Sequence, residues 1–231
     1  MFIAEGKLVI GELLRSRFQV RSLLLTPLRY SELAPALADL DAPVYVAPQA
    51  VLNAITGFNL HRGAVAAAAR GAALEPSNLL RSGRRIAVLE GLNDLENLGS
   101  LFRNAAGLGI DGVLLAPGCA DPLYRRVVRV SMGHVLHVPF AHLPSWPEGL
   151  DDITADGYTV VALTPSGDVD LDDLTPSVDR TAVLVGAEGP GLTADALKRA
   201  HVRARIPMAP GVDSLNVATA AALAFHHLRP R

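Results

Sequence analysis

The first seventy residues alternate between helical and strand-like spacing of apolar side chains. Val9, Leu13 and Leu14 form one stripe of a helix predicted over residues 5–17. Further elements are predicted in the order strand, helix, strand, helix, strand, over residues 22–26, 31–40, 44–46, 49–55 and 64–69. The pattern predicts a small α/β/α domain over residues 1–71.

Residues 85–231 repeat this alternation over a longer stretch. Apolar runs predict strands over residues 86–89, 112–115, 135–138, 158–163, 182–185 and 202–206. Apolar stripes predict helices over residues 98–108, 123–130, 145–155 and 193–199, and from residue 214 onward. Strands that alternate with helices are typical of a mostly parallel sheet covered on both faces. Residues 72–84, rich in Pro, Ser, Asn and Gly, are predicted to link the two domains.

The composition is that of a globular protein from a reducing compartment. Half of the 231 residues are hydrophobic, which is enough for a buried core, and Cys119 is the single cysteine. The first residues lack the features of a signal peptide, and no apolar run approaches the roughly 20 residues of a membrane helix. We therefore expect a cytoplasmic protein without a membrane partner.

The net charge of −2 is unevenly distributed. Residues 141–180 hold nine acids and one base, a local charge of −8, so the rest of the chain carries +6. Arg outnumbers Lys nineteen to two, and a planar guanidinium suits phosphate groups. Such clusters are compatible with a nucleic-acid partner and also with ordinary solvated helix faces.

Residues 97–105 (NLGSLFRNA) place polar side chains on one side of a predicted helix. Apolar residues fill one face, whereas Asn97 falls on another with Arg103 beside it. Amide and guanidinium groups suit a phosphate or a ribose, although a solvated surface would show a similar pattern. Gly99 favours a site, because glycine inside a helix costs about 1 kcal/mol relative to alanine and usually reflects close packing or ligand approach.

Two further stretches follow predicted strands. Residues 186–192 (GAEGPGL) turn from a strand into a helix and present backbone N–H groups, but they match neither a Walker A loop nor G-x-G-x-x-G. Glu188 in this turn could instead be a helix-capping carboxylate. Residues 206–219 (IPMAPGVDSLNVAT) lead into a helix of small residues, with Ser214 and Asn216 in its first turn. A Ser N-cap and a satisfied Asn are the alternative interpretation.

Other catalytic patterns are missing from the sequence. The seven histidines show no H-E-x-x-H or paired-ligand spacing, so we expect no metal site. No G-x-S-x-G elbow is present, which gives no support for acyl transfer.

Together and in this order, the three stretches resemble the motifs of the SpoU/TrmH family of RNA ribose 2′-O-methyltransferases, in the SPOUT superfamily. The resemblance covers roughly residues 85–229. It implies a sheet with a deep trefoil knot, S-adenosyl-L-methionine as cofactor, and a homodimer in which two subunits complete each site. Glu5-Gly6 and residues 56–63 also resemble, more loosely, the L30e-like domain that binds RNA in many members.

The resemblance implies roles for individual residues. Those implied to act in catalysis are Arg103, Asn97, Glu188, Ser214 and Asn216. Those implied to contact the methyl donor through the backbone are Gly186, Ile206 and Leu215, with Leu163, Thr164 and Met208 as lining. Asp213 and Leu95 depart from the family pattern, and Asp213 adds a carboxylate near the implied donor site.

The implied reaction is methyl transfer to a ribose 2′-hydroxyl of RNA, with ribosomal RNA favoured over transfer RNA. A guanidinium stays protonated near neutral pH, so we expect Arg103 to orient the hydroxyl and stabilise the developing alkoxide rather than to act as a base. The alternatives are a non-catalytic RNA-binding or ribosome-assembly protein that kept the fold, a tRNA-directed 2′-O-methyltransferase, and an α/β enzyme that uses another nucleotide.

Overall fold

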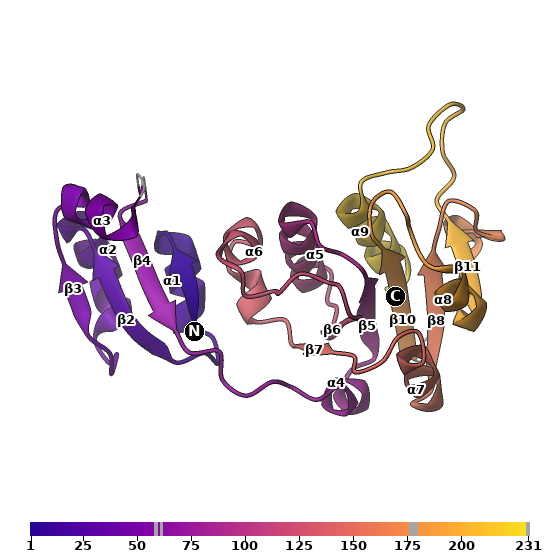
Figure 1. The fold of residues 1–231 in the computed structure, drawn as a ribbon, viewed down its shortest axis with the longest axis horizontal. Helices are drawn as coiled ribbons and strands as arrows, with labels where there is room; N and C mark the ends of the chain where they lie inside the picture. The colour runs from indigo at the N-terminus through magenta and orange to yellow at the C-terminus, as the bar shows by residue number, and fades with distance from the viewer. Residues whose placement is uncertain (58–59, 61, 176–179, 230–231) are drawn as a thin grey trace. The chain divides into compact units, whose positions relative to one another are not determined.

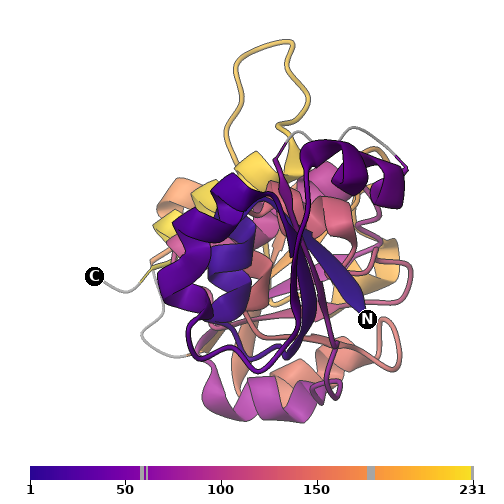
Figure 2. The same ribbon diagram turned by 90° about the vertical axis from the view of Figure 1, so that its left-hand side faces the viewer.

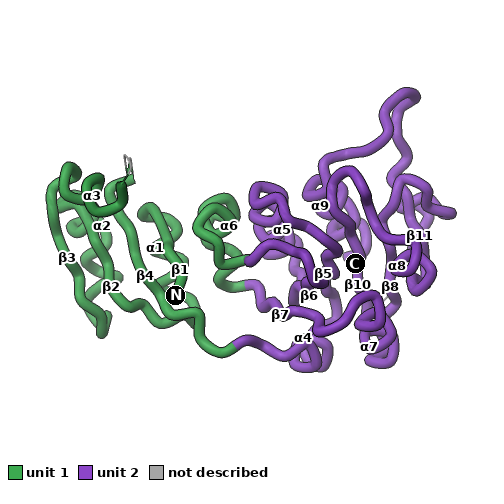
Figure 3. The backbone as a smooth tube through the Cα atoms, viewed as in Figure 1, with its two compact units in different colours: residues 1–72, 122–137 green, residues 73–121, 138–231 purple. Residues whose placement is uncertain are grey.

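The chain forms two compact units in the computed structural model, which describes residues 1–57, 60, 62–175 and 180–229 (Figure 3). Unit 1 comprises Met1–Ala72 and Pro122–His137, and unit 2 comprises Ala73–Asp121 and Val138–Arg231. The segment Pro122–His137 thus belongs to unit 1, although it lies inside the second predicted domain. Within the stretch 56–63 singled out above, Phe58, Asn59 and His61 lie outside the described residues.

Unit 1 contains a four-stranded sheet in the order β1-β4-β2-β3. Its strands are β1 (Phe2–Glu5), β2 (Val20–Leu25), β3 (Val44–Val46) and β4 (Ala64–Ala68). Strand β4 runs antiparallel to β1 and β2, and β2 runs parallel to β3. The helices of the amino-terminal part are α1 (Lys7–Leu14), α2 (Pro27–Leu37) and α3 (Gln49–Thr56). Helices α1 and α2 contact each other on one side of the sheet (Figure 2) and bury alternate strand residues such as Leu23 and Leu25.

Two boundaries in unit 1 differ from the prediction. Strand β1 was missed, because residues 5–17 gave one helical pattern, whereas Gly6 adopts a φ of 91° that separates β1 from α1. The helix predicted from residue 31 starts at Pro27, where the Thr26 hydroxyl accepts a hydrogen bond from the Arg29 backbone N–H. Pro27 therefore opens a helix as its first residue, a position that proline suits.

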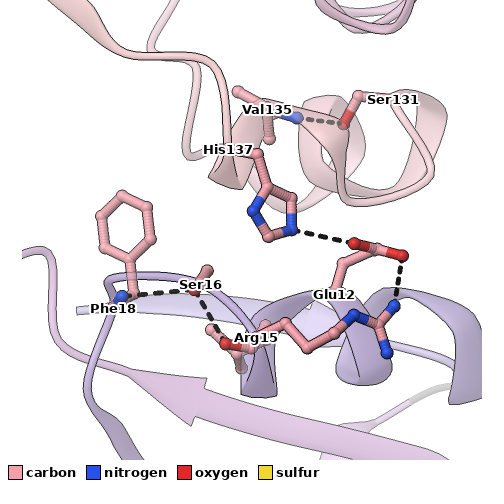
Figure 4. Close-up of polar contacts among 8 residues, drawn as sticks. Glu12, Arg15, Ser16, Phe18, Ser131, Val135 and His137 are labelled. Atoms are coloured by element: carbon pink, nitrogen blue, oxygen red, sulfur yellow. Dashed lines mark hydrogen bonds and ion pairs between the residues drawn. The ribbon is translucent and has the colours of Figure 1, made fainter. Parts of the chain in front are cut away.

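The segment Pro122–His137 packs against the amino-terminal part of unit 1. Helix α6 (Arg125–Val130) contacts β1, and the guanidinium of Arg125 lies 3.2 Å from the buried carboxylate of Glu5. The ring of His137 lies 2.8 Å from the carboxylate of Glu12, which also pairs with Arg15 (Figure 4). The predicted second domain therefore contributes packing, an ion pair and a hydrogen bond to the first unit.

The strand predicted over residues 135–138 is wrong. The backbone turns at Gly133, with a φ of 87°, and the short 3₁₀ helix η1 (His134–Leu136) follows. Val135 and Leu136 are buried, so the apolar run reports burial rather than extended backbone. The strand of this region is β7 (Phe140–His142), in unit 2.

Unit 2 contains a seven-stranded sheet in the order β7-β6-β5-β10-β8-β11-β9. Its other strands are β5 (Arg85–Glu90), β6 (Gly112–Leu115), β8 (Tyr158–Leu163), β9 (Val169–Asp170), β10 (Arg180–Gly186) and β11 (Val202–Arg205). Every neighbouring pair among these strands is parallel, which confirms the predicted sheet type. The short β9, within the acidic stretch, was not predicted.

Helices cover both faces of this sheet (Figure 1). They are α4 (Pro76–Ser82), α5 (Leu95–Gly107), α7 (Gly149–Ala155), the 3₁₀ helix η2 (Leu171–Asp173), α8 (Ala194–Arg199) and α9 (Val217–His227). One core cluster joins α4, α7 and α8 to the sheet through residues such as Leu80, Ile153 and Leu184. Helices α5 and α9 pack against each other, and α9 also contacts β10. Among the described residues, we find no helix with the length and apolar character needed to cross a bilayer.

Helix α4 lies within the predicted linker. Its Leu79 and Leu80 are 5% and 3% exposed and belong to the core of unit 2. A methyl group added at Gly112 would lie 2.8 Å from the Leu79 side chain, so α4 packs tightly on β6. Two adjacent leucines between polar residues gave too short a pattern to predict this helix.

Candidate functional site

The loops after three neighbouring strands of unit 2 enclose a cavity of about 800 Å³. Carboxyl ends of parallel strands meet at one edge of a sheet, where α/β proteins bind ligands. The lining includes every residue predicted to contact the methyl donor: Leu163, Thr164, Gly186, Ile206, Met208 and Leu215. Glu188, Asp213 and Ser214 line it as well. Segments more than forty residues apart in the sequence thus converge on one site.

The turn after β10, residues 187–192, forms one wall of the cavity. It is closed by a hydrogen bond from the Gly191 N–H to the Ala187 carbonyl, at 3.0 Å. A Cβ on Gly186 would lie 2.4 Å from the Gly191 carbonyl carbon. Gly186 is therefore required by the close approach of the turn's own backbone, before any ligand is considered.

The loop after β8 lies equally close to β11. Thr164 donates its backbone N–H to the Ala204 carbonyl at 2.9 Å, and a Cβ on Gly167 would lie 2.4 Å from the Ala204 carbonyl carbon. At the same edge, Arg205 pairs with Asp170 at 2.6 Å. These contacts fix two of the three loops around the cavity by backbone packing.

The third loop, residues 206–216, extends as a long segment between β11 and α9 (Figures 1 and 2). Asp213, Ser214 and Leu215 are exposed although they line the cavity. The helix predicted from residue 214 begins at Val217. Its N-cap is Asn216, whose Oδ1 accepts from the N–H groups of Ala218 and Thr219 at 3.1 and 3.2 Å.

Asn97, Glu188 and Asn216 form a hydrogen-bonded cluster, the polar triad. Asn97 Nδ2 donates to Glu188 Oε2 at 2.9 Å, and Asn216 Nδ2 donates to Glu188 Oε1 at 2.9 Å and to Asn97 Oδ1 at 2.7 Å. Both carboxylate oxygens are therefore held by amides from two helices. Since Glu188 also lines the cavity, the triad can present a fixed negative charge to a cationic or hydroxyl-bearing ligand.

Helices α5 and α9 are joined beside the triad. The Asp94 side chain caps α5 by accepting from the Asn97 N–H at 2.8 Å, and Asn104 Nδ2 donates to the Ala218 carbonyl at 2.8 Å. The side chain of Asn104 thus holds α9 and is not available to a ligand through this N–H. Helices α5 and α9 are in contact, and the small residues Ala218, Ala221 and Ala224 of α9 are buried.

Two of the predicted catalytic residues lie apart from the triad. Ser214 lines the cavity from the long loop and makes no hydrogen bond with another described residue. Arg103 is exposed on α5 and absent from the cavity lining, and its side chain forms no hydrogen bond or ion pair with any other described residue. The chain therefore brings Asn97, Glu188 and Asn216 together but leaves the guanidinium free of intrachain partners among the residues described.

One buried carboxylate near the cavity was missed in the sequence. Glu90, the last residue of β5, is 6% exposed and accepts hydrogen bonds from Thr193 and from the Trp146 indole N–H. A sequence signal for it existed, because this acidic residue directly follows the apolar run predicted as a strand over residues 86–89.

The site and fold define an α/β protein that binds a ligand at the carboxyl edge of a parallel sheet. Residues 84–226 match the model of the SpoU rRNA Methylase family. The chain is 50% identical over its whole length to an uncharacterized tRNA/rRNA methyltransferase of Mycobacterium tuberculosis, of which it covers 83%. The chain therefore belongs to the SpoU rRNA methylase family, as its three motif-like stretches indicate, and it is a methyltransferase of that family.

Two further similarities extend over nearly the full chain. It is 26% identical over 99% of its length to the 23S rRNA (guanosine(2553)-2′-O)-methyltransferase RlmP of Bacillus subtilis, and covers 88% of that protein. The crystal structure of an AdoMet-bound rRNA methyltransferase from Sinorhizobium meliloti matches with a TM-score of 0.82 at 27% identity, over 99% of this chain and 86% of that one.

Proposed function

We propose that the protein transfers a methyl group from S-adenosyl-L-methionine to a ribose 2′-hydroxyl of RNA, with ribosomal RNA favoured over transfer RNA. The observation that carries this proposal is the polar triad beside a cavity lined by all the residues expected to contact the donor. The similarity to RlmP, a 2′-O-methyltransferase of 23S rRNA, supports both the reaction and the favoured substrate.

The residues around the cavity suit S-adenosyl-L-methionine. A volume of about 800 Å³ lies in the range of small-molecule sites. Leu163, Ile206 and Met208 offer an apolar surface for an adenine ring, and backbone groups of the turn offer hydrogen bonds to its edge. Glu188 and Asp213 place carboxylates where a cationic ligand is favoured. When bound, the sulfonium group supplies an electrophilic methyl.

The residues of the chain act mainly by positioning and electrostatics. S-adenosyl-L-methionine held by the loops around the cavity would supply the methyl group, and the 2′-hydroxyl would release its proton to solvent. Arg103 orients the hydroxyl through the adjacent phosphate and stabilises negative charge on the oxygen, because a guanidinium remains protonated at neutral pH. The triad holds Glu188 in one orientation, and Ser214 offers a hydroxyl from the long loop.

A homodimer would complete each site. Arg103 does not line the cavity of its own chain, so in this proposal it serves the cavity of a partner subunit. Helix α9 supports pairing because it exposes Thr219 and Leu223, of which Leu223 is 43% exposed. An isologous interface of this kind should bury well over about 1,200 Å². The long loop, the close contacts at Gly167 and Gly186, and the family together support a trefoil-knotted path through unit 2.

In the same proposal, residues 1–71 bind the RNA substrate as an L30e-like domain. The test is to map ribose methylation across ribosomal and transfer RNA from cells with and without the protein. One 2′-O-methyl group missing from ribosomal RNA of the deletion strain, and restored by the wild-type chain, is the expected result. A site in transfer RNA would revise the substrate, and unchanged methylation in both RNAs would contradict the proposed reaction.

Mixing two inactive variants tests the shared site. Subunits with Arg103→Ala and subunits with Asn216→Ala each carry one defective residue. If Arg103 acts across the interface, a mixed dimer has both defects in one site and none in the other. Activity should then return on mixing. A protein that is monomeric by light scattering at micromolar concentration and still methylates RNA would contradict the dimer.

A further inference from the structure

We propose that Glu90 is a positioning residue for the methyl donor, acting through Thr193 on the turn at residues 187–192. The proposal rests on the proposed function, because it takes the cavity beside this turn as the donor site. Glu90 does not line the cavity. Its effect must therefore pass through the residues that it holds.

Glu90 connects both ends of the turn. At one end, Glu90 of β5 lies in register with Gly186, the last residue of β10. At the other end, Thr193 donates its backbone N–H to Glu90 Oε2 at 2.9 Å and its hydroxyl to Oε1 at 2.7 Å. The residues before and after the turn are thus tied to one strand end, and the turn between them carries Glu188.

The charge of Glu90 is central to this arrangement. The carboxylate is 6% exposed and accepts three hydrogen bonds, from the Thr193 N–H, the Thr193 hydroxyl and the Trp146 indole N–H. Within the described part of the chain it forms no ion pair, so these donors must offset the cost of burying the charge. A glutamine would turn an N–H₂ group toward at least one of these donors and leave a buried polar group unsatisfied.

A turn held at both ends is preorganised for its ligand. Without the hydrogen bonds between Glu90 and Thr193, donor binding would have to order residues 187–192. The entropic cost of that ordering weakens the affinity for the donor. Thr193 has a second role, since its hydroxyl also accepts the Ala196 N–H at 3.3 Å as the N-cap of α8. The carboxylate therefore fixes the turn and the helix that follows it together.

Trp146 provides a spectroscopic signal for this carboxylate, because it is the only tryptophan in the chain and its indole N–H bonds to Glu90. If donor binding changes the position or hydrogen bonds of Glu90, the fluorescence emission of Trp146 should change when S-adenosyl-L-methionine is added. A purely structural Glu90 would give no such change.

The experiment measures donor affinity in the full-length protein and in four variants. The variants are Glu90→Gln, Thr193→Val, Thr193→Ser and, as a control on the same helix, Asp195→Asn, an exposed residue paired with Lys198. The dissociation constants of S-adenosyl-L-methionine and S-adenosylhomocysteine are measured by calorimetry, and folding is checked by circular dichroism. If Glu90→Gln does not fold, the valine and serine variants of Thr193 carry the test.

We expect the dissociation constant to rise about tenfold or more in Glu90→Gln and Thr193→Val, corresponding to one lost hydrogen bond to a charged group. The donor KM should rise more than kcat falls. Thr193→Ser keeps the hydroxyl and should bind like the wild type, as should Asp195→Asn. The emission change of Trp146 on donor binding should disappear in Thr193→Val.

Two results would contradict the proposal in distinguishable ways. Folded Thr193→Val that binds the donor with wild-type affinity and keeps the emission change shows that Glu90 does not position the turn, while the proposed function stands. A wild-type protein that binds neither compound overturns the proposed function together with this inference.

Discussion

The side-chain amide of Asn97 lies 2.9 Å from the carboxylate of Glu188, which stands 91 positions further along the chain. This bond ties the first turn of α5 to the turn after β10. Asn216, at the start of α9, donates to both residues. The orientation of Glu188 therefore depends on two helices, and a change in either helix should reach the cavity.

Replacing Asn97 tests this dependence. Asn97→Asp keeps the size of the side chain but places a second carboxylate against Glu188, where like charges repel. We expect kcat/KM to fall about 10- to 100-fold, the loss expected for one hydrogen bond to a charged group. The matched control is Asn78→Asp on α4, where the side chain accepts a hydrogen bond from Arg81, and it should keep wild-type activity. Equal activity of the two variants would show that the triad does not matter.

Arg103 should affect turnover without affecting donor binding. Arg103→Ala removes an exposed guanidinium that does not line the cavity. We expect turnover to fall by orders of magnitude, with the donor dissociation constant nearly unchanged. Arg203→Ala, at an exposed arginine paired with Asp168, is the control. Wild-type turnover in Arg103→Ala would contradict the assigned role.

Gly186 should tolerate no side chain. In Gly186→Ala the new methyl would meet the Gly191 backbone at 2.4 Å, so the turn must move. We expect donor binding to be lost and the melting temperature to fall. Gly107→Ala, in α5, meets nothing within 4 Å and should be neutral or slightly stabilising, because alanine favours a helix by about 1 kcal/mol over glycine. Donor binding of wild-type strength in Gly186→Ala would show that the turn adapts.

Arg85 should stabilise unit 2 through its buried guanidinium. It donates to the Leu108 and Gly109 carbonyls at 2.8 and 3.2 Å and to the Phe225 carbonyl of α9. Burial lowers the pKa of this guanidinium, although Asp111 opposes the shift. Arg85→Met should leave these carbonyls unsatisfied and reduce the free energy of unfolding by roughly 2–4 kcal/mol in urea titrations. Arg84→Met, at an exposed neighbour, should change it little.

Unit 1 should lose part of its stability in acid through Glu12. Burial alone would raise the pKa of this carboxyl, but the hydrogen bonds and charges of Arg15 and His137 outweigh it and lower the pKa below its ordinary value. A carboxyl with a lowered pKa contributes stability above its ordinary value, and the contribution is lost as pH falls through the folded-state value. Melting temperatures of wild type and Glu12→Gln should therefore differ at pH 7 and converge toward pH 3. A constant difference across this range would contradict the expectation.

The sequence predicted the parallel sheet well, because its strands are apolar runs with clear ends. The strands at residues 112–115 and 158–163 were predicted with their observed bounds. Errors arose where a residue type is compatible with two kinds of backbone structure. Pro27 directly follows the strand predicted over residues 22–26 and was left outside the helix predicted from residue 31, whereas it begins α2. The apolar residues 135 and 136, predicted as strand, lie in a 3₁₀ helix.

The candidate site was predictable only in part. The lining of the cavity followed from the family resemblance, and the helix predicted over residues 193–199 is observed as α8, with Thr193 as its N-cap. The partnership of Asn97 with Asn216 depends on the packing of α5 against α9, which no local pattern reports. No role was predicted for Glu90, because its hydrogen-bond partners, Trp146 and Thr193, come from distant segments.

The placement of Pro122–His137 in unit 1 has a consequence for synthesis on the ribosome. Chains are made from the amino terminus, and domains usually fold as they emerge. Here residues 1–72 are synthesised well before α6. Strand β1 and the Glu5 carboxylate therefore lack the contacts of α6 and Arg125 while the first part of unit 2 is being made. Unit 1 is complete only after His137 has emerged. An exchange of the first 72 residues between proteins would therefore have to carry a matching α6 segment with it.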